Sequence, residues 1–222
     1  MKLESKYLAE LVGTGIIVLF MYNMATAAMM GHMAMGAAAG LGAGAFFLSY
    51  CLFYKSSGGH FNPVVTASYW MAGKMEQDEA MDIMKHQAIG AVAGLVLAYL
   101  FQLGLSDFEA TEIPERALAV EEGYLGVILI TGFGTAILSM IYMAIDNNKN
   151  EWVHLFRGVI LAVIVGSLMV TGSGSNPALL LIEFLLSLTT SFGDAIVGLI
   201  VYLVGCGLGA YAAGKIWNRV HG

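Results

Sequence analysis

The chain reads Gly58-Gly59-His60-Phe61-Asn62-Pro63-Val64-Val65-Thr66 at one point and Thr171-Gly172-Ser173-Gly174-Ser175-Asn176-Pro177-Ala178 at another. In each stretch a glycine-rich lead-in is followed by Asn, then by Pro, then by apolar residues. An Asn that caps a helix, with Pro at the first helical position, is typical of a helix N-terminus. The two stretches therefore predict two helices, each beginning shortly after a long apolar segment.

The composition is that of a membrane protein. Of the 222 residues, 58% are hydrophobic and 12% are charged, and the mean hydropathy is +0.75. An average soluble domain has about 25% charged residues. A spanning helix needs about 20 mainly apolar residues, and such segments lie near residues 8–30, 34–54, 85–104, 124–145, 153–172 and 194–216.

The segments 62–72 and 176–189 are too short, or too polar at their starts, to cross a membrane alone. They fit re-entrant half-helices, because irregular backbone at membrane depth is tolerated only where it lines a cavity or is buried in protein. The fold class predicted from the sequence is an all-α membrane protein with six transmembrane helices and two re-entrant half-helices.

The basic residues are distributed unevenly over this topology. With the N-terminus inside, nine of the ten Lys and Arg residues fall on one side, and only Arg116 falls on the other. The positive-inside rule then predicts that both termini are cytoplasmic. We expect an integral protein of the cell membrane, either plasma or inner.

Segments of the first half of the chain recur in the second. Residues 9–15 in the first span are echoed by residues 130–136 in the fourth. Residues 87–94 in the third span match residues 202–209 in the sixth, with glycines in register. Together with the two Asn-Pro stretches, these matches indicate a duplicated half.

The repeats divide the chain into 1–105, with a pore loop at 58–72, and 124–222, with a pore loop at 171–189. The polar stretch 106–123 is expected to be an extracellular connecting loop. Each half has three spans, so the second half enters the membrane from the opposite side. Such an inverted repeat places the functional site at the midplane, where the halves meet.

The two Asn residues suggest a chemistry for that site. The first N–H groups of a half-helix lack intrahelical partners, and the helix dipole places partial positive charge there. If the Asn side-chain oxygen caps its own helix, its NH₂ group remains free to donate into a cavity. Two such ends meeting head to head would let a neutral molecule with lone pairs pass and would repel cations.

Both Asn-Pro stretches resemble the pore loops of the aquaporin, or major intrinsic protein, family, with Val64 in place of the usual Ala. Ala9-Glu10 with Gly13-Thr14 resembles the first helix of that family, and Gln87 with Gly90, Ala91 and Gly94 resembles the third. The resemblance covers essentially the whole chain. It implies a pore within each monomer of a homotetramer in the lipid bilayer.

Residue roles follow from the resemblance. The pore-centre residues would be Asn62, Pro63, Val64, Asn176, Pro177 and Ala178. The residues that support the pore loops would be Glu10, Gly59, His60, Gln87 and Thr131. Thr131 stands where the first half has Glu10, so the second loop lacks an equivalent buried carboxylate.

The outer constriction departs from the family pattern. The residue after the second Asn-Pro-Ala is usually Arg in the family, and here it is Leu179. The other constriction positions fall at Gly42, about Ile164, and Ser173. We therefore expect a wide, uncharged and partly apolar constriction, with ion exclusion resting mainly on the half-helix ends.

These features favour a passive channel for water, glycerol, urea or other small uncharged molecules. A coupled transporter would need ionisable groups in the spans, and few besides Glu10 and Glu183 occur there. Glu183 either reaches the interface or caps loop backbone, or it faces the pore and favours cations. An enzyme would need a cluster of His, Cys or acidic residues, and we expect no metal, cofactor or nucleic acid. A non-conducting or scaffold-type protein of the same family is a further alternative.

Overall fold

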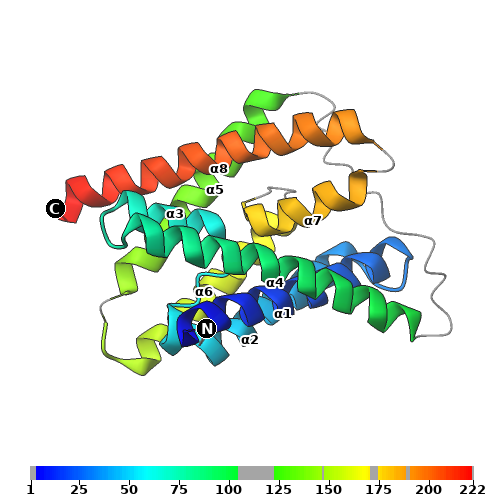
Figure 1. The fold of residues 1–222 in the computed structure, drawn as a ribbon, viewed down its shortest axis with the longest axis horizontal. Coiled ribbons are helices and arrows are strands. Elements are labelled where there is room, and N and C mark those ends of the chain that lie inside the picture. Colours follow the sequence, from blue (N-terminus) through cyan, green and yellow to red (C-terminus); the bar gives the residue numbers. More distant parts are fainter. Residues whose placement is uncertain (1–3, 105–122, 147, 171–174, 189–190, 222) are drawn as a thin grey trace.

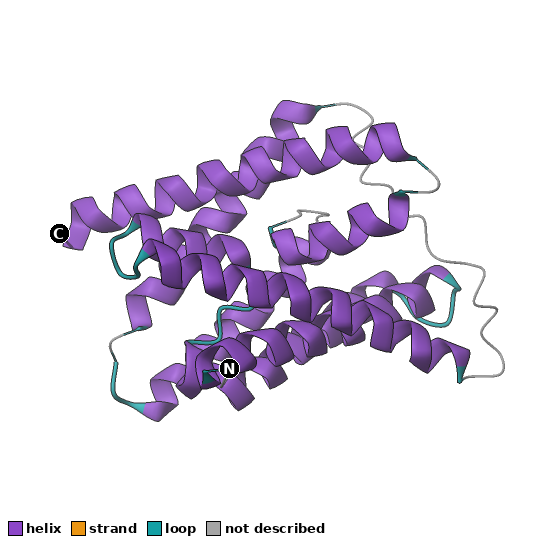
Figure 2. Cartoon of the chain, in the orientation of Figure 1, coloured by secondary structure: helices purple, strands orange, loops and turns teal. Residues whose placement is uncertain are grey.

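The computed structural model describes residues 4–104, 123–146, 148–170, 175–188 and 191–221. Within these ranges every regular element is an α-helix (Figures 1 and 2). Six helices are long and apolar enough to cross a membrane, and two are short. The long ones are α1 (Ser5–Met29), α2 (Met35–Ser57), α4 (Gln77–Leu103), α5 (Tyr124–Ile145), α6 (Glu151–Val170) and α8 (Phe192–His221), and the short ones are α3 (Pro63–Met71) and α7 (Pro177–Ser187). The predicted fold class is confirmed.

Two of the long helices extend beyond the predicted spans. The third span was expected from residue 85, but α4 begins at Gln77, with Asp78 and Glu79 in its first turn. Acidic residues stabilise a helix N-terminus through the macrodipole, so this polar turn extends the apolar helix. At the other end of the chain α8 continues to His221, with Arg219 and His221 in its last turn, where basic residues are favourable. Except for Gly123, the predicted connecting loop 106–123 lies outside the described residues.

The helices pack in two similar sets. In the first set α1 packs against α2 and α4, and in the second α5 packs against α6 and α8. Contacts between α2 and α6 join the sets on one side. The short helices α3 and α7 lie end to end between α4 and α8 (Figure 1), and each contacts both of these long helices. The short helices therefore join the two sets.

Glycines allow the long helices to cross at backbone contact. A Cβ atom on Gly94 of α4 would collide with the carbonyl oxygen of Gly15 in α1. A Cβ atom on Gly209 of α8 would likewise collide with the carbonyl oxygen of Gly132 in α5. Small residues at such crossings give the close packing on which helix association in lipid depends. The α1–α4 and α5–α8 pairs therefore both cross in close backbone contact at glycines.

The polarity of the bundle is suited to lipid. Large apolar side chains cover its surface, for example Phe133, which is 71% exposed, and Phe156, which is 68% exposed. Polar side chains such as Glu10, Thr66 and Gln87 are buried. A soluble protein rarely exposes apolar patches of this extent. Together with the six apolar helices, this pattern identifies an integral membrane protein.

The glycine contacts can be tested by Gly209→Ala. The added methyl group meets backbone and the Thr135 side chain in a fixed crossing, so α5 and α8 must separate. Overpacking of this kind costs about 1–3 kcal/mol, and we expect the thermal unfolding midpoint in detergent to fall by roughly 5 °C.

Gly207→Ala is the matched control, because Gly207 lies on the same helix and a Cβ atom there would meet nothing within 4 Å. Replacing a mid-helix glycine without a clash stabilises a helix by about 0.5–1 kcal/mol. Equal midpoints for the two variants would contradict the proposed crossing.

Candidate functional site

The N-termini of the two short helices face each other inside the bundle. Asn62 caps α3, with its Oδ1 accepting from the backbone N–H of Val64 over 3.0 Å. Asn176 caps α7 in the same way, accepting from the N–H of Ala178 over 3.0 Å. Pro63 and Pro177 are the first residues of the two helices. The helix starts predicted from the Asn-Pro stretches are therefore present.

Hydrogen bonds between the two Asn motifs join the half-helices. The Asn62 side-chain NH₂ donates to the carbonyl oxygen of Ser175 over 2.8 Å. The Asn176 NH₂ donates to the carbonyl oxygen of Phe61 over 3.0 Å. The expectation that both NH₂ groups remain free is therefore wrong in part, because each gives one hydrogen to the carbonyl preceding the other Asn. An amide nitrogen carries two hydrogens, so one remains on each.

A buried carboxylate holds the loop before α3. Glu10 of α1 is 0% exposed. Its Oε1 accepts from the Ser57 hydroxyl over 2.6 Å and from the His60 N–H over 2.9 Å. Its Oε2 accepts from the Phe61 N–H and from the Gln87 side chain, both over 2.7 Å. Charge-assisted bonds of this kind are stronger than neutral ones, so Glu10 ties α2, the loop and α4 together.

The polar side chains of the first loop form one connected network. Gln87 also donates to the Thr66 hydroxyl over 3.1 Å. The Nδ1 atom of His60 lies 3.1 Å from the same hydroxyl, and His60 is buried. Gly59 has φ +67°, which only glycine adopts at little cost. Thus His60 and Gln87 both bond to Glu10, and the Gly59 N–H donates to Ser57, which is also bonded to Glu10.

Phe61 makes a contribution that the sequence did not reveal. Its φ is +47°, a left-handed conformation that is rare for a bulky residue. The ring is fully buried and lies over Gly13 of α1, where any Cβ atom would collide with it. This conformation aims the Phe61 carbonyl at Asn176. Backbone strain of this kind persists only where the surroundings fix it, and here Glu10 holds the Phe61 N–H.

The second half lacks this network in the part that can be described. Thr131 is buried at the α5–α8 crossing beside Gly205, and its hydroxyl has no hydrogen-bond partner among the described residues. The lead-in residues 171–174, including the predicted constriction residue Ser173, lie outside the described part of the chain. Ser175 is buried next to Gly134, which corresponds to Gly13 in the repeat.

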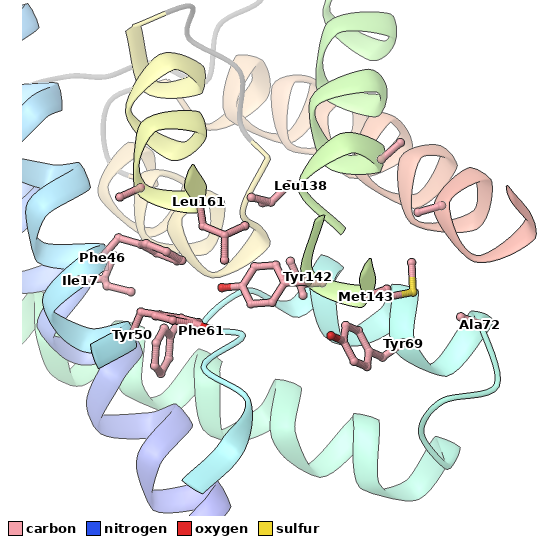
Figure 3. Close-up of a cluster of buried hydrophobic side chains, with 14 of the residues drawn as sticks. Ile17, Phe46, Tyr50, Phe61, Tyr69, Ala72, Leu138, Tyr142, Met143 and Leu161 are labelled. Carbon is pink, nitrogen blue, oxygen red and sulfur yellow. The ribbon is translucent and has the colours of Figure 1, made fainter. Parts of the chain in front are cut away.

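Buried aromatic and aliphatic side chains surround the first loop. We call them the aromatic cluster, and its main members are Ile17, Phe46, Tyr50, Phe61, Tyr69, Leu138, Tyr142 and Leu161. Figure 3 shows the Tyr142 ring in the middle of this cluster, with its hydroxyl turned toward Phe61. That hydroxyl donates to the carbonyl oxygen of Gly59 over 2.7 Å. The cluster is therefore in direct contact with the loop.

Arg157 of α6 is the largest side chain that is fully buried, with 1% of its surface exposed. The positive-inside argument counts it among the nine basic residues on the predicted cytoplasmic side, and the structure adds that it is buried. Its position inside the predicted span 153–172 was the available signal, since a charge within a span is costly and commonly functional. Its Nε donates to the Tyr50 hydroxyl over 2.5 Å.

The predicted constriction residues occupy three different helices. Gly42 is buried on α2, and Ile164 on α6 and Leu179 on α7 are half-buried. Both Ile164 and Leu179 pack against the aromatic cluster. Leu179 also packs against a second buried group that includes Val18 and Leu95. The position where the family usually has Arg is therefore apolar here. Glu183, on the same helix as Leu179, is also half-buried.

Six spanning helices with two half-helices capped by Asn and joined through them define a membrane channel fold. The chain belongs to the major intrinsic protein family, because the model of that family matches residues 1–217. The resemblance drawn from the Asn-Pro stretches is thereby confirmed.

Relatives are found among aquaporins and glycerol facilitators. The chain is 28% identical to "Probable aquaporin AqpM" of Archaeoglobus fulgidus, over 98% of this chain and 97% of that protein. It is 27% identical to a glycerol uptake facilitator protein of Pseudomonas aeruginosa, over 94% of this chain and 78% of that protein. The solved structure of an aquaglyceroporin from Plasmodium falciparum has the same fold, with a TM-score of 0.82, 18% identity and coverage of 97% and 96%.

The carboxylate of Glu10 can be tested by Glu10→Gln. Each carboxylate oxygen accepts two hydrogen bonds, so either orientation of a Gln amide places its NH₂ against two donors. We expect a loss of about 3 kcal/mol of stability, visible as a lower thermal unfolding midpoint of the purified protein.

Glu79→Gln is the control, because Glu79 pairs with Lys6 over 2.7 Å at a partly exposed position. An exposed ion pair contributes about 0–1 kcal/mol, so the midpoint should barely change. A Glu10→Gln midpoint equal to that of Glu79→Gln would refute the role of the carboxylate.

The link between the half-helices can be tested by Asn176→Asp. The substitution replaces the NH₂ that donates to the Phe61 carbonyl with an anionic oxygen that faces it. We expect reduced solute flux, or a cation leak, in vesicles that contain the variant. Asn148→Asp is the control at an exposed loop position, and unchanged flux and ion exclusion in folded Asn176→Asp would contradict the prediction.

Proposed function

We propose that the protein is a passive channel for water and small neutral solutes, with a pore in each monomer. The observation that supports this most directly is the reciprocal pair of hydrogen bonds between the two Asn motifs. These bonds bring two helix N-termini together inside a membrane protein. Irregular backbone at that depth is tolerated only where it is buried in protein or lines a water-filled cavity. The family consists of channels rather than enzymes.

Selection at the pore centre would depend on the second hydrogen of each Asn NH₂. A passing molecule with lone pairs can accept from Asn62 and then from Asn176, which replaces part of its hydration. The two half-helix N-termini carry partial positive charge at the same place. A neutral molecule is not repelled there, whereas a cation is.

The outer constriction supports solutes larger than water. A guanidinium at the Leu179 position would narrow the pore, donate hydrogen bonds and repel cations. The apolar Leu179 side chain neither donates hydrogen bonds nor repels cations, and it narrows the pore less than Arg would. Gly42, another of the expected constriction residues, has no side chain to narrow it. We therefore propose relaxed selectivity, with polyols of glycerol size and urea among the permeating molecules.

The arrangement in the membrane is part of the proposal. Two repeats, 1–105 and 124–222, are joined by an extracellular loop at 106–123, with both termini in the cytoplasm. The similar packing of α1 with α4 and of α5 with α8 supports the repeat, and the one-sided basic residues support the orientation. We further propose a homotetramer in the cell membrane.

A closed pore is the second candidate, and one observation favours it. Leu179 packs against two buried apolar groups, and Ile164 packs against one of them. Apolar constrictions can exclude water by dewetting. The protein would then contribute membrane contacts rather than conduction.

Stopped-flow light scattering on proteoliposomes decides between these functions. We expect wild type to pass water, glycerol and urea, without saturation and without dependence on ion gradients. A Leu179→Arg variant should lose glycerol flux by at least roughly tenfold, since a narrowed filter discriminates by several kcal/mol, while keeping water flux.

Leu185→Arg is the matched control, because Leu185 lies on the same short helix and is exposed. It should leave the ratio of glycerol to water flux unchanged. A wild type that passes only water, or a Leu179→Arg protein with unaltered glycerol flux, would refute the wide constriction. Vesicles without any flux would support the closed pore.

A further inference from the structure

Arg157 lies between two tyrosine rings in the second turn of α6, on the side of the membrane that the basic residues predict to be cytoplasmic. Its Cζ atom is 5.4 Å from the centre of the Tyr50 ring and 5.5 Å from that of Tyr142. Besides the bond to the Tyr50 hydroxyl, Nη1 donates to the backbone carbonyl of Tyr142 over 3.0 Å. Cation–π contacts and hydrogen bonds therefore fix the guanidinium in one position.

Two glycines make room for the Tyr50 ring that packs against this arginine. A Cβ atom on Gly158 of α6 would lie 2.7 Å from the Tyr50 ring. A Cβ atom on Gly59, on the pore loop, would lie 3.0 Å from the same ring. The Tyr50 ring thus fits between α6 and the loop only because both positions lack a side chain.

Arg157 is one of the residues that line an open pocket of about 290 Å³. Gly58, where the first pore loop begins, lines the same pocket. Among the lining residues, three are cationic, namely Lys55, Lys149 and Arg157, and two are acidic, namely Asp146 and Glu151. Asp146 lies 3.7 Å from Arg157 and Glu151 pairs with Lys55. The lining therefore has an excess of one positive charge, counting His154 as neutral.

We propose that Arg157 excludes cations at the cytoplasmic mouth of the pore, so that the fixed positive charge absent at Leu179 is supplied at the opposite end. The inference rests on the proposed channel function. A cation that enters beside Gly58 is repelled by the field of a guanidinium that is buried and cannot swing away, because Tyr50 and Tyr142 hold it. Arg157 thereby acts together with the half-helix ends as a second barrier.

A purely structural role would not require a charge at this place. Burying a charge costs several kcal/mol, and well-packed apolar residues often stabilise as much as a buried ion pair does. The Asp146 carboxylate lies 3.7 Å from the Nη1 atom of Arg157, and Asp146 is partly exposed. The guanidinium charge is thus only partly compensated, which is what a cation barrier needs.

The test compares Arg157→Gln with Arg157→Lys and wild type in proteoliposomes, with Rb⁺ uptake and glycerol flux measured on the same preparations. We expect Rb⁺ uptake to rise at least roughly tenfold in Arg157→Gln, because a unit charge a few ångström from the path is removed. Arg157→Lys should restore exclusion. Lys85→Gln, which removes an exposed charge on α4, is the control and should stay at background.

The outcomes separate this inference from the channel function. Absence of both water and glycerol flux in wild type would refute the channel function itself. Flux of water or glycerol in wild type, together with equal Rb⁺ uptake in wild type and folded Arg157→Gln, would overturn only the role of Arg157. If Arg157→Gln does not fold, Asp146→Asn replaces it in the test. Chloride uptake at least roughly twofold above wild type would support the barrier, because the positive field of Arg157 then lacks its counter-charge. Unchanged chloride uptake would overturn it.

Discussion

The structure depends on the way two helix ends are satisfied far from water. A helix that starts inside a membrane leaves backbone N–H groups that lipid cannot bond, and each would cost several kcal/mol. Here the side chain of Asn62 or Asn176 serves as a cap for its own helix and as a donor to the opposite loop. Two of these bonds cap the helices, and the other two, between the opposite motifs, set the separation of the two helix ends.

The two halves reach this arrangement by unequal means. The first loop is held by the Glu10 carboxylate, the Tyr142 hydroxyl and the seat of the Phe61 ring over Gly13. At the corresponding place in α5, Thr131 makes no hydrogen bond within the described residues. Charge is distributed unevenly as well, since Leu179 of α7 is apolar whereas α6 carries the buried Arg157. The two sets of helices thus pack alike while their polar residues differ.

Much of this could be read from the sequence, because the deciding features are local. Asn followed by Pro fixes a helix start, and apolar runs of sufficient length fix the spans. The bounds of α4 were missed, since its polar first turns carry no apolar signal. The left-handed φ of Phe61, the partner of each Asn NH₂ and the burial of Arg157 were missed for a different reason. The φ of Phe61 and the partners of the Asn side chains depend on residues distant in the chain, such as Gly13, and no short-range pattern encodes them. For Arg157 the position inside a predicted span was a signal, but its partner Tyr50 is equally distant in the chain.

The crosswise position of the short helices has a consequence for biosynthesis. Part of the packing surface of α3 is α8, at the far end of the chain, and α7 in turn packs against α4. Chains are made from the N-terminus and their parts fold as they emerge. The ribosome therefore releases Asn62 and α3 long before α7 and α8 are made. Until then the surfaces of α3 and α4 that pack against these helices have no partner. Neither half is a finished unit, so the channel is completed only when the last helix is inserted.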